Sequence, residues 1–296
     1  MNAKLLDVLS PNVIAGVLTV IGTALIDAHQ YRWALSMLNA ALVLDNKRIF
    51  AYISRGYLFK NVGRYEDALK DYDSAIQLDP DQNIPSTMHE ITGLGAILGR
   101  RGTLHLVMGN YHKALSDLSL AIDNGIKEFA LFGMRGGIYL SESSYEKALA
   151  DFNHSIELSP KDAWSFSQRS EVYRRMGQVE NAIDDINHAL ELAPNDCYML
   201  AMRSRILNSI GKQDEAERDV ANALGNQSKD SWSIYGIAAV HTILGNNSQA
   251  ISALTEAIHL DGSLREDLRL DPVFDTMQQD PAFQQLFIWP SSKLCL

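Results

Sequence analysis

The sequence predicts an all-α fold, an α-solenoid of seven helix-turn-helix repeats closed by a C-terminal helical cap. Two periodic features of the 296-residue chain support this prediction. The first is an alanine that returns every 34 residues, apart from one interval that holds twelve additional residues. It occupies positions Ala34, Ala68, Ala114, Ala148, Ala182, Ala216 and Ala250. The second is a small residue twelve positions before each alanine, at Gly22, Gly56, Gly102, Gly136, Ser170, Ser204 and Ala238.

These small side chains predict how the helices pack. Two short amphipathic helices can lie antiparallel with their axes about 8–10 Å apart when small residues face each other. Five of the seven repeats also carry a glycine between the two positions, which suits the left-handed backbone that ends a helix. These glycines are Gly63, Gly109, Gly177, Gly211 and Gly245. Each repeat is therefore expected to be two helices joined by a tight turn.

The pattern is most complete in residues 55–80. They contain Arg55-Gly56, then Gly63-Arg64-Tyr65-Glu66-Asp67-Ala68, and end in Leu78-Asp79-Pro80. This spacing resembles the tetratricopeptide repeat, and the resemblance covers residues 15–264. It implies a right-handed solenoid in which the first helices line a concave groove. The repeats are assigned to residues 15–48, 49–82, 95–128, 129–162, 163–196, 197–230 and 231–264.

The remaining segments are a lead segment at 1–14, an insertion at 83–94, capping helices at 265–288 and a tail at 289–296. In the cap, Asp271-Pro272 and Asp280-Pro281 each predict an N-cap followed by proline at the first helical position. In the insertion, residues 87–90 match a capping box and predict an early start for the next helix. The insertion is either a tolerated loop or a lip on the binding face.

A second periodic pattern pairs opposite charges. Each of the five central repeats carries an arginine in its first helix and an aspartate sixteen residues later in its second. The pairs are Arg55 with Asp71, Arg101 with Asp117, Arg135 with Asp151, Arg169 with Asp185, and Arg203 with Asp219. Because a buried charge needs a partner, and a guanidinium binds a carboxylate through two hydrogen bonds, we expect a structural pair inside each repeat. The alternative is a ladder of arginines for anionic ligands.

The segment from Val13 to Ile26 is an uninterrupted run of apolar, glycine and threonine residues. A membrane-spanning helix needs about 20 apolar residues, so a span is not expected here. The run is in register with the repeats and predicts a buried helix of the first repeat. A cleaved signal segment is the alternative. Its position at the end of the array also makes it the best candidate for a self-association surface.

The composition excludes several classes of function. A net charge of −10 argues against a nucleic-acid partner. Two cysteines, Cys197 and Cys295, do not provide a disulfide framework or a zinc site, which favours a reducing, cytoplasmic location. The glycine-rich residues 93–99 lack the spacing of a dinucleotide loop. We expect no enzymatic activity, cofactor, metal ion or small-molecule substrate.

The expected function is a non-catalytic scaffold or adaptor that binds a protein or peptide segment in the concave groove. The alternatives are a structural subunit that self-associates through its N-terminal repeat, and a membrane-associated or exported assembly factor. The resemblance implies a partner-binding wall of Phe50, Tyr57, Arg100, Met134, Trp164, Gln168, Arg174, Tyr198, Met202, Arg205, Trp232 and Tyr235, with Glu171 as a further groove candidate. Tryptophan, tyrosine and arginine often dominate binding energy at interfaces. The aromatic residues at 164, 198 and 232 could instead pack against the preceding repeat.

Overall fold

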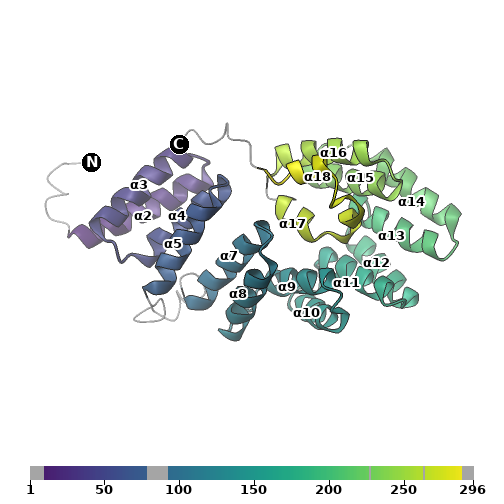
Figure 1. Cartoon of the computed structure of the whole chain (residues 1–296), viewed down its shortest axis with the longest axis horizontal. Coiled ribbons are helices and arrows are strands. Elements are labelled where there is room, and N and C mark those ends of the chain that lie inside the picture. The colour runs from purple at the N-terminus through teal and green to yellow at the C-terminus, as the bar shows by residue number, and fades with distance from the viewer. Residues whose placement is uncertain (1–9, 79–92, 227, 263, 289–296) are drawn as a thin grey trace. The chain divides into compact units, whose positions relative to one another are not determined.

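In the computed structural model every regular element of the described residues is a helix, and no strand occurs among them. The structure describes residues 10–78, 93–226, 228–262 and 264–288. These residues form two compact units, which divide between Ile126 and Lys127 (Figure 1). The prediction of an all-α, solenoid-type fold of consecutive helix pairs is confirmed.

The described residues of the first unit form three helix pairs, which correspond to the first three predicted repeats. They are α2 (Pro11–Asp27) with α3 (Tyr31–Leu44), α4 (Ile49–Asn61) with α5 (Tyr65–Gln77), and α7 (Leu94–Val107) with α8 (Tyr111–Asp123). The predicted capping box at residues 87–90 lies outside the described residues.

The second unit contains four helix pairs and the C-terminal elements. The pairs are α9 (Phe129–Ser141) with α10 (Tyr145–Leu158), α11 (Ala163–Arg175) with α12 (Val179–Leu192), α13 (Cys197–Ser209) with α14 (Gln213–Gly225), and α15 (Ser231–Ile243) with α16 (Asn247–Leu260). This unit ends in α17 (Leu264–Leu270), the 3₁₀ helix η2 (Pro272–Met277) and α18 (Pro281–Gln285). We refer to residues 264–288 as the C-terminal segment.

Small residues bring the two helices of a repeat into direct contact, as their spacing predicts. A Cβ atom placed on Gly22 would lie 2.7 Å from Cγ of Leu38, and one placed on Gly56 would lie 2.8 Å from Cε1 of Tyr72. Real Cβ atoms do not approach other atoms so closely, so larger side chains here would push the helices apart. The alanines of the second helices are buried in all seven repeats.

The turns inside the repeats have left-handed backbone at one residue. The five predicted glycines adopt φ values between 74° and 78°. In the two repeats without a glycine, His29 and Ser143 adopt the same conformation, with φ of 57° and 58°. The geometry of the turn is therefore retained where the residue that favours it is absent, at the cost of some steric strain.

Helix α2 is buried on one side only, although the sequence predicted a buried helix. Gly22 and Ile26 face α3, whereas Val13, Val17 and Val20 are between 46% and 63% exposed. Among the described residues of the first unit no helix pair precedes α2, and this side is left uncovered. None of the helices in the described ranges has both the length and the hydropathy needed to cross a membrane.

The C-terminal segment begins with a helix, α17, that the sequence pattern did not predict. The two predicted N-caps are present. Asp271 accepts a hydrogen bond from the backbone N–H of Val273 at 2.9 Å, and Asp280 accepts one from Ala282 at 2.8 Å. The first of the two proline-initiated elements is a 3₁₀ helix and the second is a single short α-helix.

All five predicted Arg–Asp pairs are present and have the same geometry. In each repeat Nε and Nη2 of the arginine donate to the two carboxylate oxygens of the aspartate at 2.7–2.8 Å. The aspartate side chains are only 5–10% exposed. Nη1 also donates to a neighbouring side chain in Arg55 (to Asn39), Arg101 (to Asp73), Arg169 (to Asn153) and Arg203 (to Asn187). These acceptors lie in the second helix of the preceding repeat, so the pairs link helices within and between repeats.

Breaking one pair should destabilise the second unit. We expect Arg169→Met to lower the free energy of unfolding by about 2–4 kcal/mol, because Asp185 would remain buried without its partner. The double variant Arg169→Met/Asp185→Leu should recover most of this loss, and Arg218→Met, at an exposed position on α14, should change stability by less than about 0.5 kcal/mol. Chemical denaturation followed by circular dichroism measures the differences. A single variant as stable as the wild type would contradict a structural role for the pair.

Candidate partner-binding site

The C-terminal segment lies against the first helices of the second unit. We call the surface formed by α9, α11, α13 and α15 the first-helix face. Helix α17 contacts α9, and η2 contacts α15. A Cβ atom placed on Gly137 of α9 would lie 3.3 Å from Cδ1 of Leu270, and Thr242 of α15 donates to Sδ of Met277 at 3.2 Å. The segment therefore follows this face across several repeats.

Asp271 joins the segment to two first helices at once. Its carboxylate accepts hydrogen bonds from the hydroxyl of Tyr198 on α13 at 3.0 Å and from the hydroxyl of Tyr235 on α15 at 2.8 Å. Gln168 of α11 donates to the Tyr198 hydroxyl at 3.0 Å, which extends the network to a third helix. Because all acceptors are buried, the network specifies one position of the segment.

Burial dominates the ionisation of this network. It raises the pKa of Asp271 to about 6, although the backbone N–H of Val273, the two tyrosine hydroxyls and the charge of Arg205 act in the opposite direction. Burial also raises the pKa of Tyr198 and of Tyr235 well above the ordinary value. The hydroxyls of Tyr198 and Tyr235 therefore stay protonated, and can donate, over the pH range in which Asp271 titrates.

Apolar side chains of the segment reinforce this attachment. Phe274 and Phe283 are completely buried, and the Phe274 ring packs against Tyr235 with 5.4 Å between centroids. The Phe283 ring lies 6.1 Å from Phe274. Burying an aromatic side chain of this size contributes about 2–3 kcal/mol, so the segment is part of the core of the second unit.

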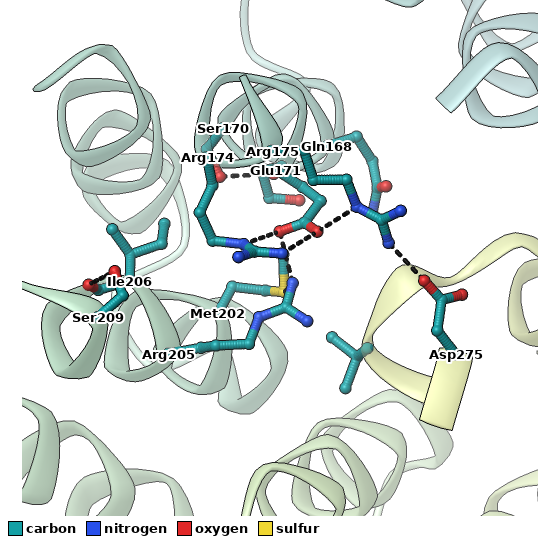
Figure 2. Close-up of polar contacts among 12 residues, drawn as sticks. Gln168, Ser170, Glu171, Arg174, Arg175, Met202, Arg205, Ile206, Ser209 and Asp275 are labelled. Carbon is teal, nitrogen blue, oxygen red and sulfur yellow. Dashed lines mark hydrogen bonds and ion pairs between the residues drawn. The ribbon is translucent and has the colours of Figure 1, made fainter. Parts of the chain in front are cut away.

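Beside the segment, three arginines surround one buried glutamate (Figure 2). Arg174 on α11 donates from Nε and Nη2 to the carboxylate of Glu171 at 2.8 and 2.9 Å. Arg175 donates from Nε at 2.8 Å, and Arg205 on α13 donates from Nη2 at 2.5 Å. Arg175 also donates from Nη2 to Asp275 of the C-terminal segment. We call Arg174, Arg175 and Arg205 the guanidinium cluster.

The cluster keeps Glu171 ionised in a buried place. Burial alone would raise the pKa of Glu171, but the hydrogen bonds and charges of Arg174, Arg205 and Arg175 outweigh it and hold the pKa below the ordinary value. The glutamate side chain is 0% exposed, whereas the three arginine side chains are between 19% and 28% exposed. The buried carboxylate therefore anchors cations that still reach the surface.

Four residues of the expected partner-binding wall are buried. Gln168, Tyr198, Met202 and Tyr235 are at most 3% exposed. The resemblance implies an accessible wall, with packing of Tyr198 on the preceding repeat as the alternative. In the structure the C-terminal segment packs on this surface, and Asp271 accepts hydrogen bonds from the hydroxyls of Tyr198 and Tyr235. Tyr198 and Tyr235 therefore hold the protein's own segment in the described structure, while Gln168 bonds to Tyr198 and Met202 lies in the same hydrophobic core.

The two tryptophans of the wall are partly exposed and pack on their neighbours. A Cβ atom on Gly133 of the preceding repeat would lie 2.9 Å from Cζ3 of Trp164. Trp232 donates from Nε1 to Asp196 at 2.6 Å, and its ring lies 5.8 Å from that of Tyr198 in the preceding repeat. Trp164 and Trp232 therefore both have packing roles that the sequence left open.

The other expected residues are distributed over both units. Phe50, Arg100 and Met134 are half-buried, and Tyr57 is 42% exposed. Arg174 and Arg205 belong to the guanidinium cluster. Within the second unit, the structure brings together the wall residues Gln168, Arg174, Tyr198, Met202, Arg205, Trp232 and Tyr235.

Three residues of the site were not among the predicted wall residues: Arg175, Asp271 and Asp275. For Glu171 a signal exists in the sequence, because it precedes Arg174 and Arg175 by three and four positions and Arg205 by one repeat length. The contact of Asp275 with Arg175 joins residues one hundred positions apart, and no local pattern indicates it.

The described residues contain no group of three or more histidine, cysteine, aspartate or glutamate side chains placed to hold a metal ion. The carboxylates of the site are occupied by guanidinium or hydroxyl donors. This arrangement can bind polar and charged groups of a polypeptide segment, and it positions no nucleophile beside a general base.

The chain matches models of the tetratricopeptide repeat at residues 49–82, 130–162 and 165–196. No curated protein sequence matches it. Among solved structures, it is similar to a tetratricopeptide repeat protein from Parabacteroides merdae, with a TM-score of 0.63, 16% identity, and coverage of 88% of this chain and 99% of that one. It also resembles PilW, a type IV pilus biogenesis factor, with a TM-score of 0.62, 15% identity, and coverage of 72% and 93%. A third similar structure is YrrB, with a TM-score of 0.52, 17% identity, and coverage of 73% and 96%.

The raised pKa of Asp271 predicts a pH-dependent attachment of the segment. The ordinary aspartate pKa is about 3.9, so the folded state binds the proton more tightly than the unfolded state does. The stability that protonated Asp271 contributes is fully present below about pH 4 and is lost as the pH rises through about 6. Relative to Asp271→Asn, the wild type should lose on the order of 2–3 kcal/mol between pH 4 and pH 7. Urea unfolding at several pH values measures this difference, and parallel pH profiles of the two proteins would contradict it.

Proposed function

The chain is a tetratricopeptide repeat protein, and from this premise we propose that it is a non-catalytic scaffold or adaptor that binds a peptide or protein segment on the first-helix face of its second unit. The observation that supports this proposal is the position of the C-terminal segment, which lies along that face. The face therefore has the shape and the hydrogen-bonding groups to accept a stretch of polypeptide.

The partner would bind beside the C-terminal segment. The tyrosine hydroxyls and the pocket around Phe274 are already filled, whereas Arg174, Arg175 and Arg205 are partly exposed. Arginines held in place by a buried carboxylate lose little freedom on binding, which favours affinity. The partly exposed Trp164 and Trp232 add apolar surface on α11 and α15.

One similar structure supports peptide binding by analogy. YrrB is described as a tetratricopeptide repeat protein with an unusual peptide-binding site. At 17% identity this likeness concerns the fold, and the residues that would bind in the present protein have to be identified on the protein itself.

A selection from displayed twelve-residue peptides with the full-length protein tests the proposal. We expect peptides that bind with micromolar affinity and that slow amide hydrogen exchange in α11 and α13. Exchange in the helices of the first unit should be unchanged and serves as the internal control. Failure to select any binding peptide, or protection confined to the second helices, would contradict the proposed function.

A second candidate function is self-association through α2, because three valines form an exposed apolar row at positions 13, 17 and 20. Sedimentation at several protein concentrations should then show a dimer that Val20→Glu converts to a monomer. Val43→Glu is the matched control, because Val43 is 85% exposed on α3, outside that row. A wild-type protein that stays monomeric at all concentrations would exclude this function.

A further inference from the structure

The guanidinium cluster contains more positive charge than its structural role requires. Three arginines from two neighbouring repeats share the single carboxylate of Glu171. The five structural Arg–Asp pairs satisfy each buried carboxylate with one guanidinium. Neutralising Glu171 would likewise take one arginine, so two positive charges are in excess before Asp275 is counted.

The donors of the cluster are also incompletely used. Each guanidinium has five N–H groups. Nη1 of Arg174, Arg175 and Arg205 has no hydrogen-bond partner among the described residues, and neither has the buried Nε of Arg205. The Nη1 groups of these partly exposed cations are held in place by the bonds to Glu171 and form a preorganised site for an anion.

Asp275 shows which anion the site accepts. The C-terminal segment places this carboxylate on Nη2 of Arg175, where the side chain remains 55% exposed. Glu171 and Asp275 are the carboxylates that bond to the three arginines, and Asp271, on which the charge of Arg205 also acts, supplies a third negative charge when it is ionised. A partner carboxylate that takes the place of Asp275 keeps this balance, whereas the two negative charges of a phosphate would exceed it.

We propose that the guanidinium cluster is a subsite for a carboxylate of the partner segment, supplied by an acidic side chain or by the α-carboxylate at the end of the segment. The carboxylate accepts hydrogen bonds from the unused donors of Arg174 and Arg205 and competes with Asp275 for Arg175. This inference rests on the proposed function and specifies its partner as an acidic peptide. Because the protein as a whole carries a net charge of −10, such a cluster of arginines at its surface is selective.

Peptides selected on the wild-type protein provide the test, each compared with a version in which aspartate and glutamate are replaced by asparagine and glutamine. Arg205→Gln should weaken binding of the acidic version about tenfold and leave binding of the amide version unchanged. Asp275→Asn should tighten binding of the acidic version severalfold, because Arg175 becomes available. Arg218→Gln, on the exposed surface of α14, is the matched control and should change neither.

Neither Arg205→Gln nor Asp275→Asn is expected to disturb folding. In Arg205→Gln the Glu171 carboxylate keeps Arg174 and Arg175, and Asp275→Asn changes only a half-exposed side chain. A peptide that loses affinity when its terminal carboxylate is amidated identifies that group as the source, and one that retains affinity identifies a side chain. Either result supports the subsite.

Three results would overturn the inference. If Arg205→Gln weakened binding of the acidic and the amide peptides equally, the carboxylate subsite would be refuted. The proposed function of peptide binding would still be supported. Competition by inorganic phosphate that is stronger than competition by acetate would show that the site prefers phosphate. The absence of any selected peptide would overturn both the subsite and the proposed function.

Discussion

The hydrogen bonds of Asp271 with Tyr198 and Tyr235 are the interaction on which the account of this protein depends. They attach the C-terminal segment to two first helices in a buried environment, where an unpaired carboxylate would be costly. The position of the segment decides which residues of the first-helix face are covered and which remain accessible. Phe274 and Phe283 add apolar burial, and Asp275 reaches the guanidinium cluster from the same segment.

Buried carboxylates serve two different purposes in this protein. In the Arg–Asp pairs, one guanidinium satisfies one carboxylate, and Nη1 of Arg55, Arg101, Arg169 and Arg203 donates to the second helix of the preceding repeat. These pairs hold helices together and leave little to bind a ligand. Glu171 differs because three guanidinium groups converge on it, and it fixes their positions without neutralising them. The same chemistry thus gives a structural pair in one place and a binding surface in another.

Features that repeat along the sequence could be predicted from it. The helix pairs, the small residues such as Gly56 and the pairing of Arg55 with Asp71 recur at fixed spacing, and their contacts lie within one repeat or between neighbours. The return of the C-terminal segment onto the first-helix face could not be predicted in this way. Asp275 and Arg175 are one hundred residues apart, so their contact depends on tertiary packing and leaves no local pattern.

Amide hydrogen exchange of the native full-length protein tests the central claim most directly. If the C-terminal segment is docked as described, the amides of α17, η2 and α18 will be protected to a degree similar to those of α13 and α15. Exchange of the whole segment within seconds, with α13 and α15 still protected, would show that the segment does not occupy the first-helix face.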